Sequence, residues 1–205
     1  MECQTSLESQ QQNKQPKKEK QTEVIIYGGS NLIKIEQAAK NIFKKKVVKY
    51  TNLSKSGATL KNQEIWTNVP PAKANTVLIV GIQPNGYFVK QFEDFAELYI
   101  EFFRQLLTTG WRHDQLYCCG IFPRGKKLNW KTQRKAEETL MEFLIGEDID
   151  HFSFFGMADD FFLQPHLLFG KADRRRKKYI HLNKASRKKL AIAIRQKILR
   201  FLKKQ

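Results

Sequence analysis

The stretch Val24-Ile25-Ile26-Tyr27-Gly28-Gly29-Ser30-Asn31-Leu32 decides the fold of this chain. Its run of apolar and aromatic residues is typical of a strand that is buried on both faces of a sheet. The two glycines that follow mark a tight turn at the end of the strand. The sequence therefore predicts a buried strand over residues 23–27 that opens onto Ser30.

The rest of the chain alternates between short apolar runs and helical periodicity. The apolar runs predict four more strands, at residues 47–50, 76–80, 115–122 and 150–155. Apolar residues spaced by three and four predict helices, at residues 35–45, 88–107, 130–144 and 183–202. This alternation predicts an α/β domain with three layers, α/β/α, around a five-stranded parallel sheet. Residues 54–74 are predicted to be mostly a connection.

One predicted helix carries a conspicuous aromatic stripe. Its members recur at steps of four, three, four, three and four: Phe88, Phe92, Phe95, Tyr99, Phe102 and Leu106. Such a stripe could stack on nucleic-acid bases, but it is also what a helix needs in order to pack on a sheet. We interpret it as core.

The chain has 205 residues, of which 41% are hydrophobic, and this is enough for one ordinary domain with a full core. Residues 1–22 are rich in Gln, Lys, Ser and Glu and contain few apolar side chains. We predict that they form a disordered basic or polar linker and that residues 23–205 form the domain.

Positive charge is concentrated at one end. The formal net charge is +17, and residues 171–205 alone hold 15 Lys and Arg against one Asp. A nearly neutral body with a strongly basic end predicts a surface that attracts polyanions. A solvated charged tail is the alternative.

Several classes of protein and site are disfavoured. The three cysteines are an odd number, and Cys118 and Cys119 are adjacent, which predicts a reducing, cytoplasmic location. The sequence has no 18-residue apolar run and no signal-peptide apolar region, so no membrane span is expected. The four histidines are scattered and no Cys-x-x-Cys occurs, so we expect neither a metal nor a cofactor.

Short motifs in a fixed order give the chain a family resemblance. From about residue 23 to 204 it resembles the SGNH (GDSL-type) hydrolases, whose four blocks carry Ser, Gly, Asn and His. Ser30 matches the first block, with Gly29 where the family usually has Asp, and Gly57 matches the second. Gln83 takes the Asn position of the third block, or Asn85 does with a two-residue slide.

The fourth block of the family reads Asp-x-x-His-Leu-Asn, and its match here is Lys178-x-x-His181-Leu182-Asn183. The run Ile121-Phe122-Pro123-Arg124-Gly125 also resembles the loop after the family's fourth strand. The resemblance implies an SGNH hydrolase-like sheet with the flavodoxin-like strand order. It also implies that Ser30 attacks an ester and that His181 accepts its proton, with Gly57 and Gln83 stabilising the oxyanion.

The carboxylate that orients the histidine is replaced by Lys178. Losing that partner costs about 10⁴-fold in rate in the serine-protease template, and misplacing an oxyanion donor costs about 10²-fold. We therefore predict a pseudo-hydrolase without catalytic residues, in which Ser30 caps the next helix and His181 is a hydrogen-bonded corner residue. Its catalytic remnants would be Ser30, Gly57, Gln83 and His181. The alternative is an active esterase on short acyl esters in which Asp173 or Asp160 supplies the acid.

The basic residues predict RNA as a partner, because arginine binds phosphates and stacks on unpaired bases. The predicted RNA-binding residues are Arg174, Arg175, Arg176, Lys177, Lys178, Arg187, Lys188, Arg124, Lys126, Lys127, Lys34, Lys40 and Lys44. Further cations decorate the closing helix: Arg195, Lys197, Arg200, Lys203 and Lys204.

A hydrolase scaffold that lacks its acid and carries many basic residues resembles the C-terminal domain family of Oskar, an insect germ-plasm organiser. This resemblance implies binding to the 3′ untranslated regions of mRNA in a cytoplasmic germ granule, with other granule proteins as further partners. A membrane-surface module is another alternative, because the closing helix is basic and amphipathic. Its apolar side, with Leu190, Ile194, Ile198 and Leu202, is better placed against the sheet.

Overall fold

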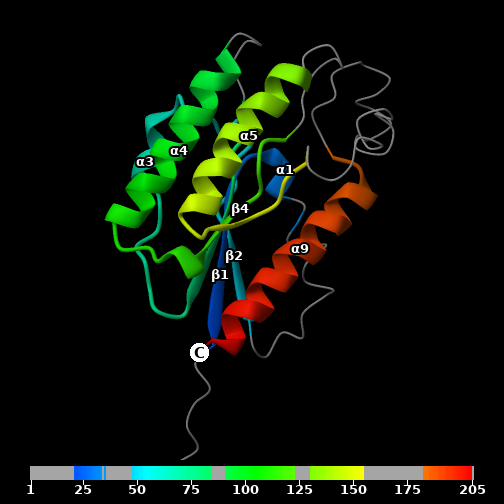
Figure 1. Cartoon of the computed structure of the whole chain (residues 1–205). Helices are drawn as coiled ribbons and strands as arrows, with labels where there is room; N and C mark the ends of the chain where they lie inside the picture. The colour runs from blue at the N-terminus through cyan, green and yellow to red at the C-terminus, as the bar shows by residue number, and fades with distance from the viewer. Residues whose placement is uncertain are drawn as a thin grey trace, which may run out of the picture.

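The computed structural model describes residues 21–33, 35, 48–84, 91–122, 130–154 and 182–204. Its five strands are all parallel and lie in the order β2-β1-β3-β4-β5 (Figure 1). Their bounds are β1 Thr22–Gly28, β2 Val48–Asn52, β3 Thr76–Gly81, β4 Leu116–Cys118 and β5 Asp150–His151. The predicted parallel sheet and its flavodoxin-like order are confirmed.

Strand β1 lies inside the sheet and pairs on both sides. Thr22 is in register with Val48 of β2, and Glu23 with Thr76 of β3. Successive side chains point to opposite faces, so Val24 and Ile26 join one hydrophobic cluster while Ile25 and Tyr27 join the other. The apolar run Val24–Tyr27 is therefore buried on both faces of the sheet, as predicted.

Helices cover both faces of the sheet. They are α1 Ser30–Ile33, α3 Gln63–Thr67, α4 Phe92–Thr108, α5 Trp130–Gly146 and α9 Lys184–Lys203, with a short 3₁₀ helix, η2, at His113–Gln115. Residues of α3, α4 and α5 share one hydrophobic cluster, whereas α9 contributes to the other. Figure 1 shows α4 and α5 side by side, with α9 separate from them.

The aromatic stripe of α4 is core. Phe95, Tyr99 and Phe102 are each 1% exposed or less, and the rings of Phe95 and Tyr99 lie 5.5 Å apart. Stacking on nucleic-acid bases needs exposed rings. The interpretation as core is confirmed for the described part of the stripe, and Phe88 lies outside the described residues.

Helix α9 begins with a side-chain cap and packs along one edge. The Asn183 side chain accepts a hydrogen bond from the Ser186 N–H at 2.8 Å. Leu190, Ile194 and Ile198 are buried, and Leu202 packs at the margin. The apolar side of α9 is thus used against the sheet, as expected.

Some element bounds differ from the prediction. Strands β4 and β5 are shorter than predicted, and beyond them the N–H groups of Ile121 and Phe154 donate to the buried carboxylate of Glu137. Helix α3 was not predicted: it has five residues and buries only Ile65, so its periodicity is too short to detect. The helix predicted at residues 35–45 lies outside the described residues except for Ile35.

Cys118 and Cys119 are buried thiols that form no disulfide. Burial raises the pKa of the Cys118 thiol to about 12, so it stays protonated and unreactive at neutral pH. Within the described residues, we find no helix that is both long and apolar enough to cross a membrane.

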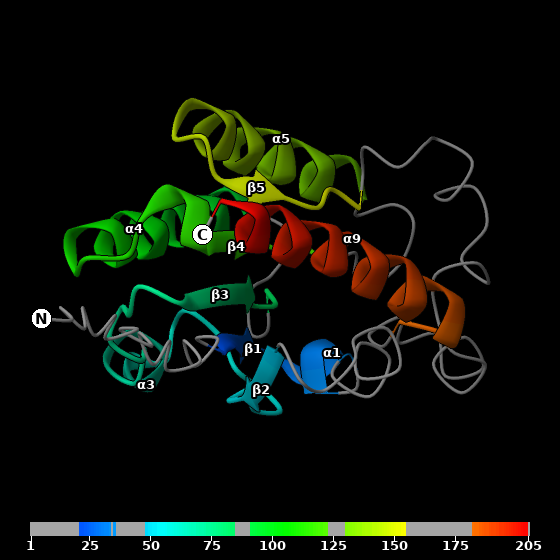
Figure 2. The same ribbon diagram turned by 90° about the horizontal axis from the view of Figure 1, so that it is seen from below.

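Lys197 is a correction to the expected surface of α9. Its side chain is only 4% exposed, and its ammonium lies 3.0 Å from Asp150 at the start of β5. Arg200 reaches the same carboxylate at 2.8 Å. Figure 2 shows the end of α9 beside β4 and β5. Two of the cations expected to decorate α9 therefore pair with Asp150.

The pKa values of this cluster follow from its surroundings. Burial alone would raise the pKa of Asp150, but the hydrogen bond and charge of Lys197, with the charge of Arg200, outweigh it and lower that pKa. A carboxyl whose pKa is lowered by folding stabilises the protein above its unfolded pKa of about 3.9. That contribution is lost as the pH falls through the folded pKa.

We expect Asp150→Asn to lower the free energy of unfolding by about 3 kcal/mol, because it leaves the buried Lys197 without a carboxylate. Lys197→Met, which removes the buried charge itself, should cost less. Urea unfolding of both variants at pH 7 measures the difference. At pH 3 the difference in the free energy of unfolding between Asp150→Asn and the parent should be smaller than at pH 7. An unchanged difference would contradict the pairing of Asp150 with Lys197.

Candidate active site

Ser30 lies where β1 ends and α1 begins. Gly28 has φ +150°, and a Cβ there would collide with the carbonyl oxygen of Gly81, so only glycine allows this close approach of β1 and β3. The Gly29 N–H donates to the same Gly81 oxygen at 2.9 Å. Ser30 follows, half-buried, at the carboxyl edge of the sheet, where parallel α/β sheets place their ligands.

The hydroxyl of Ser30 points to Gln83. Ser30 Oγ donates to Gln83 Oε1 at 3.4 Å, and Ser30 is the first residue of α1 rather than the residue before it. Gln83 is 3% exposed. The structure thus places Gln83 beside the serine, whereas Asn85 lies outside the described residues.

Tyr99 holds the loop that carries Gln83. Its hydroxyl, on α4, accepts the Ile82 N–H at 3.0 Å in the protein interior. Burial raises the pKa of Tyr99 well above its usual value, so the phenol remains neutral. Hydrophobic periodicity predicts that Tyr99 is a core aromatic residue, but it does not indicate that the tyrosine hydroxyl accepts a hydrogen bond.

The two departures from the family pattern next to Ser30 explain each other. A Cβ at Gly29 would lie 3.1 to 3.3 Å from three side-chain atoms of Gln83. Gln83 would therefore have to move by a few tenths of an ångström to admit the aspartate that the family usually has at this position. Because Gln83 is one methylene longer than the usual asparagine, it fills the space that the missing side chain leaves.

Gly57, of the second block, lies in a loop that continues the pairing of β1 and β2. The Leu53 N–H donates to the Ile26 oxygen at 2.8 Å, and the Lys55 N–H to the Gly28 oxygen at 2.9 Å. Gly57 adopts φ +78° in the exposed turn that follows. These bonds anchor the second block to the strand end that bears Ser30.

The fourth block is joined to the first by one buried hydrogen bond. The Leu182 N–H donates to Asn31 Oδ1 at 3.0 Å across 151 positions of the sequence. The residue after His181 thus lies next to the residue after Ser30. His181 and Lys178 themselves lie outside the described residues.

Glu137 is a residue at this edge that sequence reasoning missed. It is 1% exposed, and its carboxylate accepts the N–H groups of Ile121 and Phe154, each at 3.2 Å, and the Ser153 hydroxyl at 2.8 Å. It therefore ties together the loops that follow β4 and β5. The available signal was its position beside Ala136 on the buried side of α5, where a charged residue is unusual.

Of the predicted RNA-binding residues, the structure describes two. Arg187 is half-buried and Lys188 is exposed, both near the start of α9. Because Leu182 is bonded to Asn31, this end of α9 lies at the same sheet edge as Ser30. The other predicted residues lie outside the described residues: Arg174, Arg175, Arg176, Lys177, Lys178, Arg124, Lys126, Lys127, Lys34, Lys40 and Lys44.

In the described part of the chain, no three His, Cys, Asp or Glu side chains are grouped so as to hold a metal ion.

Several solved structures, among them hydrolases, have a similar fold. A lipase/acylhydrolase from Enterococcus faecalis is 10% identical, with a TM-score of 0.62 over 87% of this chain and 96% of its own. A catalytic mutant of Axe2, an acetylxylan esterase from Geobacillus stearothermophilus, is 10% identical, with a TM-score of 0.61 over 86% and 94%. The acetyl xylan esterase AlAXEase is 11% identical, with a TM-score of 0.56 over 85% and 98%. No family model and no curated protein matches the sequence.

The chain thus has the α/β fold of SGNH hydrolase structures, and nothing connects it specifically to the Oskar family. The comparisons contradict the prediction of a non-enzymatic pseudo-hydrolase, because the structures that share the fold are a lipase/acylhydrolase and acetylxylan esterases. That prediction rests on two positions, Lys178 in place of the acid and Gln83 in place of the oxyanion-stabilising asparagine. A Ser-His-acid arrangement is defined by geometry, so another loop at the same edge can supply the carboxylate.

The contact between Gly29 and Gln83 predicts energetic coupling. Gly29→Ala should lower the free energy of unfolding by about 1 kcal/mol through overpacking, and Gln83→Asn should relieve much of that loss in the double variant. Urea unfolding of the two single variants and the double variant measures the coupling. Gly146→Ala is the control, because a Cβ there meets nothing within 4 Å. Strictly additive losses would show that the two positions are independent.

Proposed function

We propose that the chain hydrolyses short acyl esters, with Ser30 as the nucleophile and His181 as its general base. One observation carries the proposal: three of the four blocks that the resemblance identifies meet at one edge of the sheet. Ser30 bonds to Gln83, and Asn31, next to Ser30, bonds to Leu182, next to His181. A fold shared with esterases supports this function.

Each of the four blocks contributes one residue to the proposed reaction. Ser30 Oγ attacks the ester carbonyl, and its proton passes to His181. The carbonyl oxygen becomes an oxyanion, which needs donors about 2.7–3.1 Å away. Gly57 offers a backbone N–H that none of the described residues accepts. The Gln83 amide carries a donor beside its acceptor, so rotation about its last torsion turns its NH₂ group towards the oxyanion.

The orienting acid comes from another position than Lys178. Lysine only donates hydrogen bonds, and its charge disfavours the imidazolium that forms during the reaction. Asp160 and Asp173 precede His181 in the sequence. In this proposal one of them takes the place of the missing aspartate.

Ser30→Ala should abolish hydrolysis of p-nitrophenyl acetate and butyrate, with kcat/KM falling by at least about 10³-fold. Thr108→Ala, which removes an exposed hydroxyl at the far end of α4, is the control and should keep full activity. Asn substitutions of Asp160 and Asp173 then identify the acid, because only one should cost about 10⁴-fold. Equal activity of the parent and Ser30→Ala would refute the assignment.

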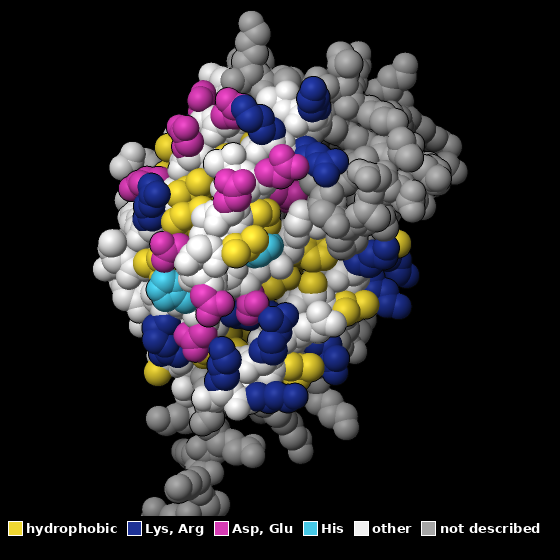
Figure 3. Space-filling view, viewed as in Figure 1, with side chains coloured by type: hydrophobic (Ala, Val, Ile, Leu, Met, Phe, Trp, Pro, Cys, Tyr) yellow, Lys and Arg dark blue, Asp and Glu magenta, His cyan; other side chains and the backbone are white. Residues whose placement is uncertain are grey.

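We propose RNA binding as a second function, favoured by the distribution of charge. Lys and Arg side chains gather at the lower right of Figure 3, where α9 runs in Figure 1. Lys184 and Lys188 are exposed on α9. Together with the basic run of residues 174–178, they would attract a phosphate backbone to the edge that bears Ser30. Binding of mRNA in a cytoplasmic germ granule belongs to this proposal.

Lys188→Glu should weaken binding of a single-stranded RNA and lower the salt dependence of that binding. Loss of one phosphate contact reduces the slope of log K against log salt by about 0.7. Fluorescence anisotropy with a labelled polyuridine at several salt concentrations measures the slope. Lys73→Glu, the same charge change near the amino end of β3, is the control. Identical slopes for both variants would exclude α9 from the interface.

A further inference from the structure

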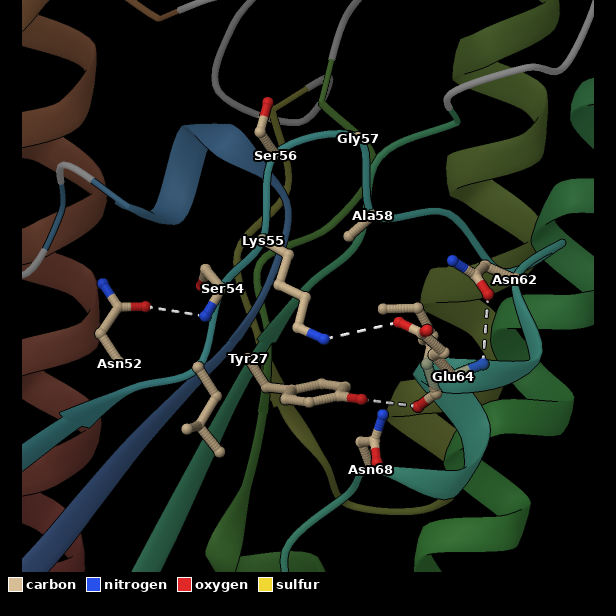
Figure 4. Close-up of a pocket in the computed structure, with 12 residues that line it drawn as sticks. Tyr27, Asn52, Ser54, Lys55, Ser56, Gly57, Ala58, Asn62, Glu64 and Asn68 are labelled. Carbon is tan, nitrogen blue, oxygen red and sulfur yellow. Dashed lines mark hydrogen bonds and ion pairs between the residues drawn. The ribbon is translucent and has the colours of Figure 1, made fainter.

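A cavity of about 460 Å³ lies between α3 and the loop that follows β2. Its volume falls within the range of small-molecule sites, about 300–1,000 Å³. Figure 4 shows Lys55 reaching from the loop towards Glu64 on α3, with Tyr27 of β1 also lining the space. Ser30, Gln83 and α9 do not line this cavity.

The described lining combines apolar surface from Tyr27, Leu53 and Ile65 with polar side chains, and it carries no excess charge. Lys55 Nζ and Glu64 Oε2 are 3.4 Å apart, and the two side chains are 65% and 64% exposed. An exposed ion pair of this kind contributes only about 0–1 kcal/mol, so a ligand can separate it at small cost. The pair offers one charged donor and one charged acceptor, and their charges cancel.

Amide and hydroxyl groups supply the other contacts. Asn62 and Asn68 lie at the two ends of α3; Asn62 uses its oxygen to accept the Glu64 N–H at 3.2 Å. The Asn68 side chain makes no hydrogen bond with any described residue, and the same holds for the exposed Ser56 hydroxyl. Both amides and hydroxyls can donate and accept.

Tyr27 sets the inner wall. Burial raises the pKa of its phenol to about 12, with the charge of Glu64 acting in the same direction, so the hydroxyl stays protonated. It donates to the Ile65 carbonyl at 2.7 Å and is thereby occupied. The ring remains as an apolar surface beneath the polar groups.

We propose that this cavity binds a neutral, hydroxyl-rich small molecule of the size of one sugar ring. Cancelled charges disfavour an anion or a cation, and a wall that mixes apolar surface with amides and hydroxyls suits a ligand that has both kinds of surface. A sugar has both hydroxyls for these groups and an apolar face for Tyr27. This binding does not depend on catalysis at Ser30.

Occupation of the cavity would act on the second block. Gly57 lines the cavity, and the same loop is bonded to Gly28 through the Lys55 N–H. A ligand that contacts Lys55 and Ser56 would therefore restrain the segment that carries Gly57. The site couples ligand binding to the geometry near Ser30.

The test is a titration of the ¹⁵N-labelled Ser30→Ala protein, which cannot turn over an ester, with D-glucose and N-acetyl-D-glucosamine. We expect the chemical shifts of the Lys55, Ser56, Gly57 and Asn68 amides to change on addition of sugar and to reach saturation below about 50 mM. Saturation in this range corresponds to a Kd on the order of a millimolar. Glucose 6-phosphate and glucosamine, which carry opposite charges, should bind more weakly than the neutral sugars.

Asn68→Leu should weaken sugar binding at least about threefold, because it removes a hydrogen-bonding group. Gln63→Leu, the same change at an exposed position of α3 outside the cavity, should leave it unchanged. Glu64→Gln, which removes the charged acceptor, is a second variant in case Asn68→Leu disturbs α3. The proposal would be overturned by any of three results. These are absence of the chemical-shift changes, equal sugar binding by the two Leu variants, and tighter binding of a charged sugar than of a neutral one. Loss of ester hydrolysis alone would leave it standing.

Discussion

The hydrogen bond from the Leu182 N–H to Asn31 Oδ1 is the interaction on which the site depends. It is buried and joins two segments that are 151 positions apart in the sequence. A buried amide that loses its partner costs about 1–3 kcal/mol, so this contact resists separation of the two segments. Through it, the start of α9 and the end of β1 share one edge of the sheet. Both proposed functions rest on that proximity: one needs His181 near Ser30, and the other needs the basic end near the same edge.

Residues around Ser30 show why single departures from a motif mislead. Gly29 and Gln83 each differ from the family pattern, and each alone suggests a damaged site. In the structure the longer amide occupies the space that a side chain at position 29 would take. Packing density leaves little room for both, so the two positions can be interpreted only together.

Charge on α9 serves two different purposes. Lys197 and Arg200 pair with Asp150 at the start of β5 and fasten the end of the helix to the sheet. Lys184 and Lys188, at the other end, are exposed near the edge that carries Ser30. A net charge counted along the sequence therefore overstates the charge that a polyanion would meet.

The sequence by itself determined the layers of this protein. Alternating apolar runs and helical periodicity sufficed to predict the parallel sheet, because burial on two faces imposes a pattern on every strand. The motif order likewise predicted that Ser30, Gly57 and Gln83 belong to one site, and the structure brings Ser30 and Gln83 within hydrogen-bonding distance. Only the tertiary structure decided which partners meet: Tyr99 with Ile82, Glu137 with the loops after β4 and β5, and Lys197 with Asp150. These contacts join segments far apart in the chain, and local periodicity records which face a residue occupies but not which polar group it will face.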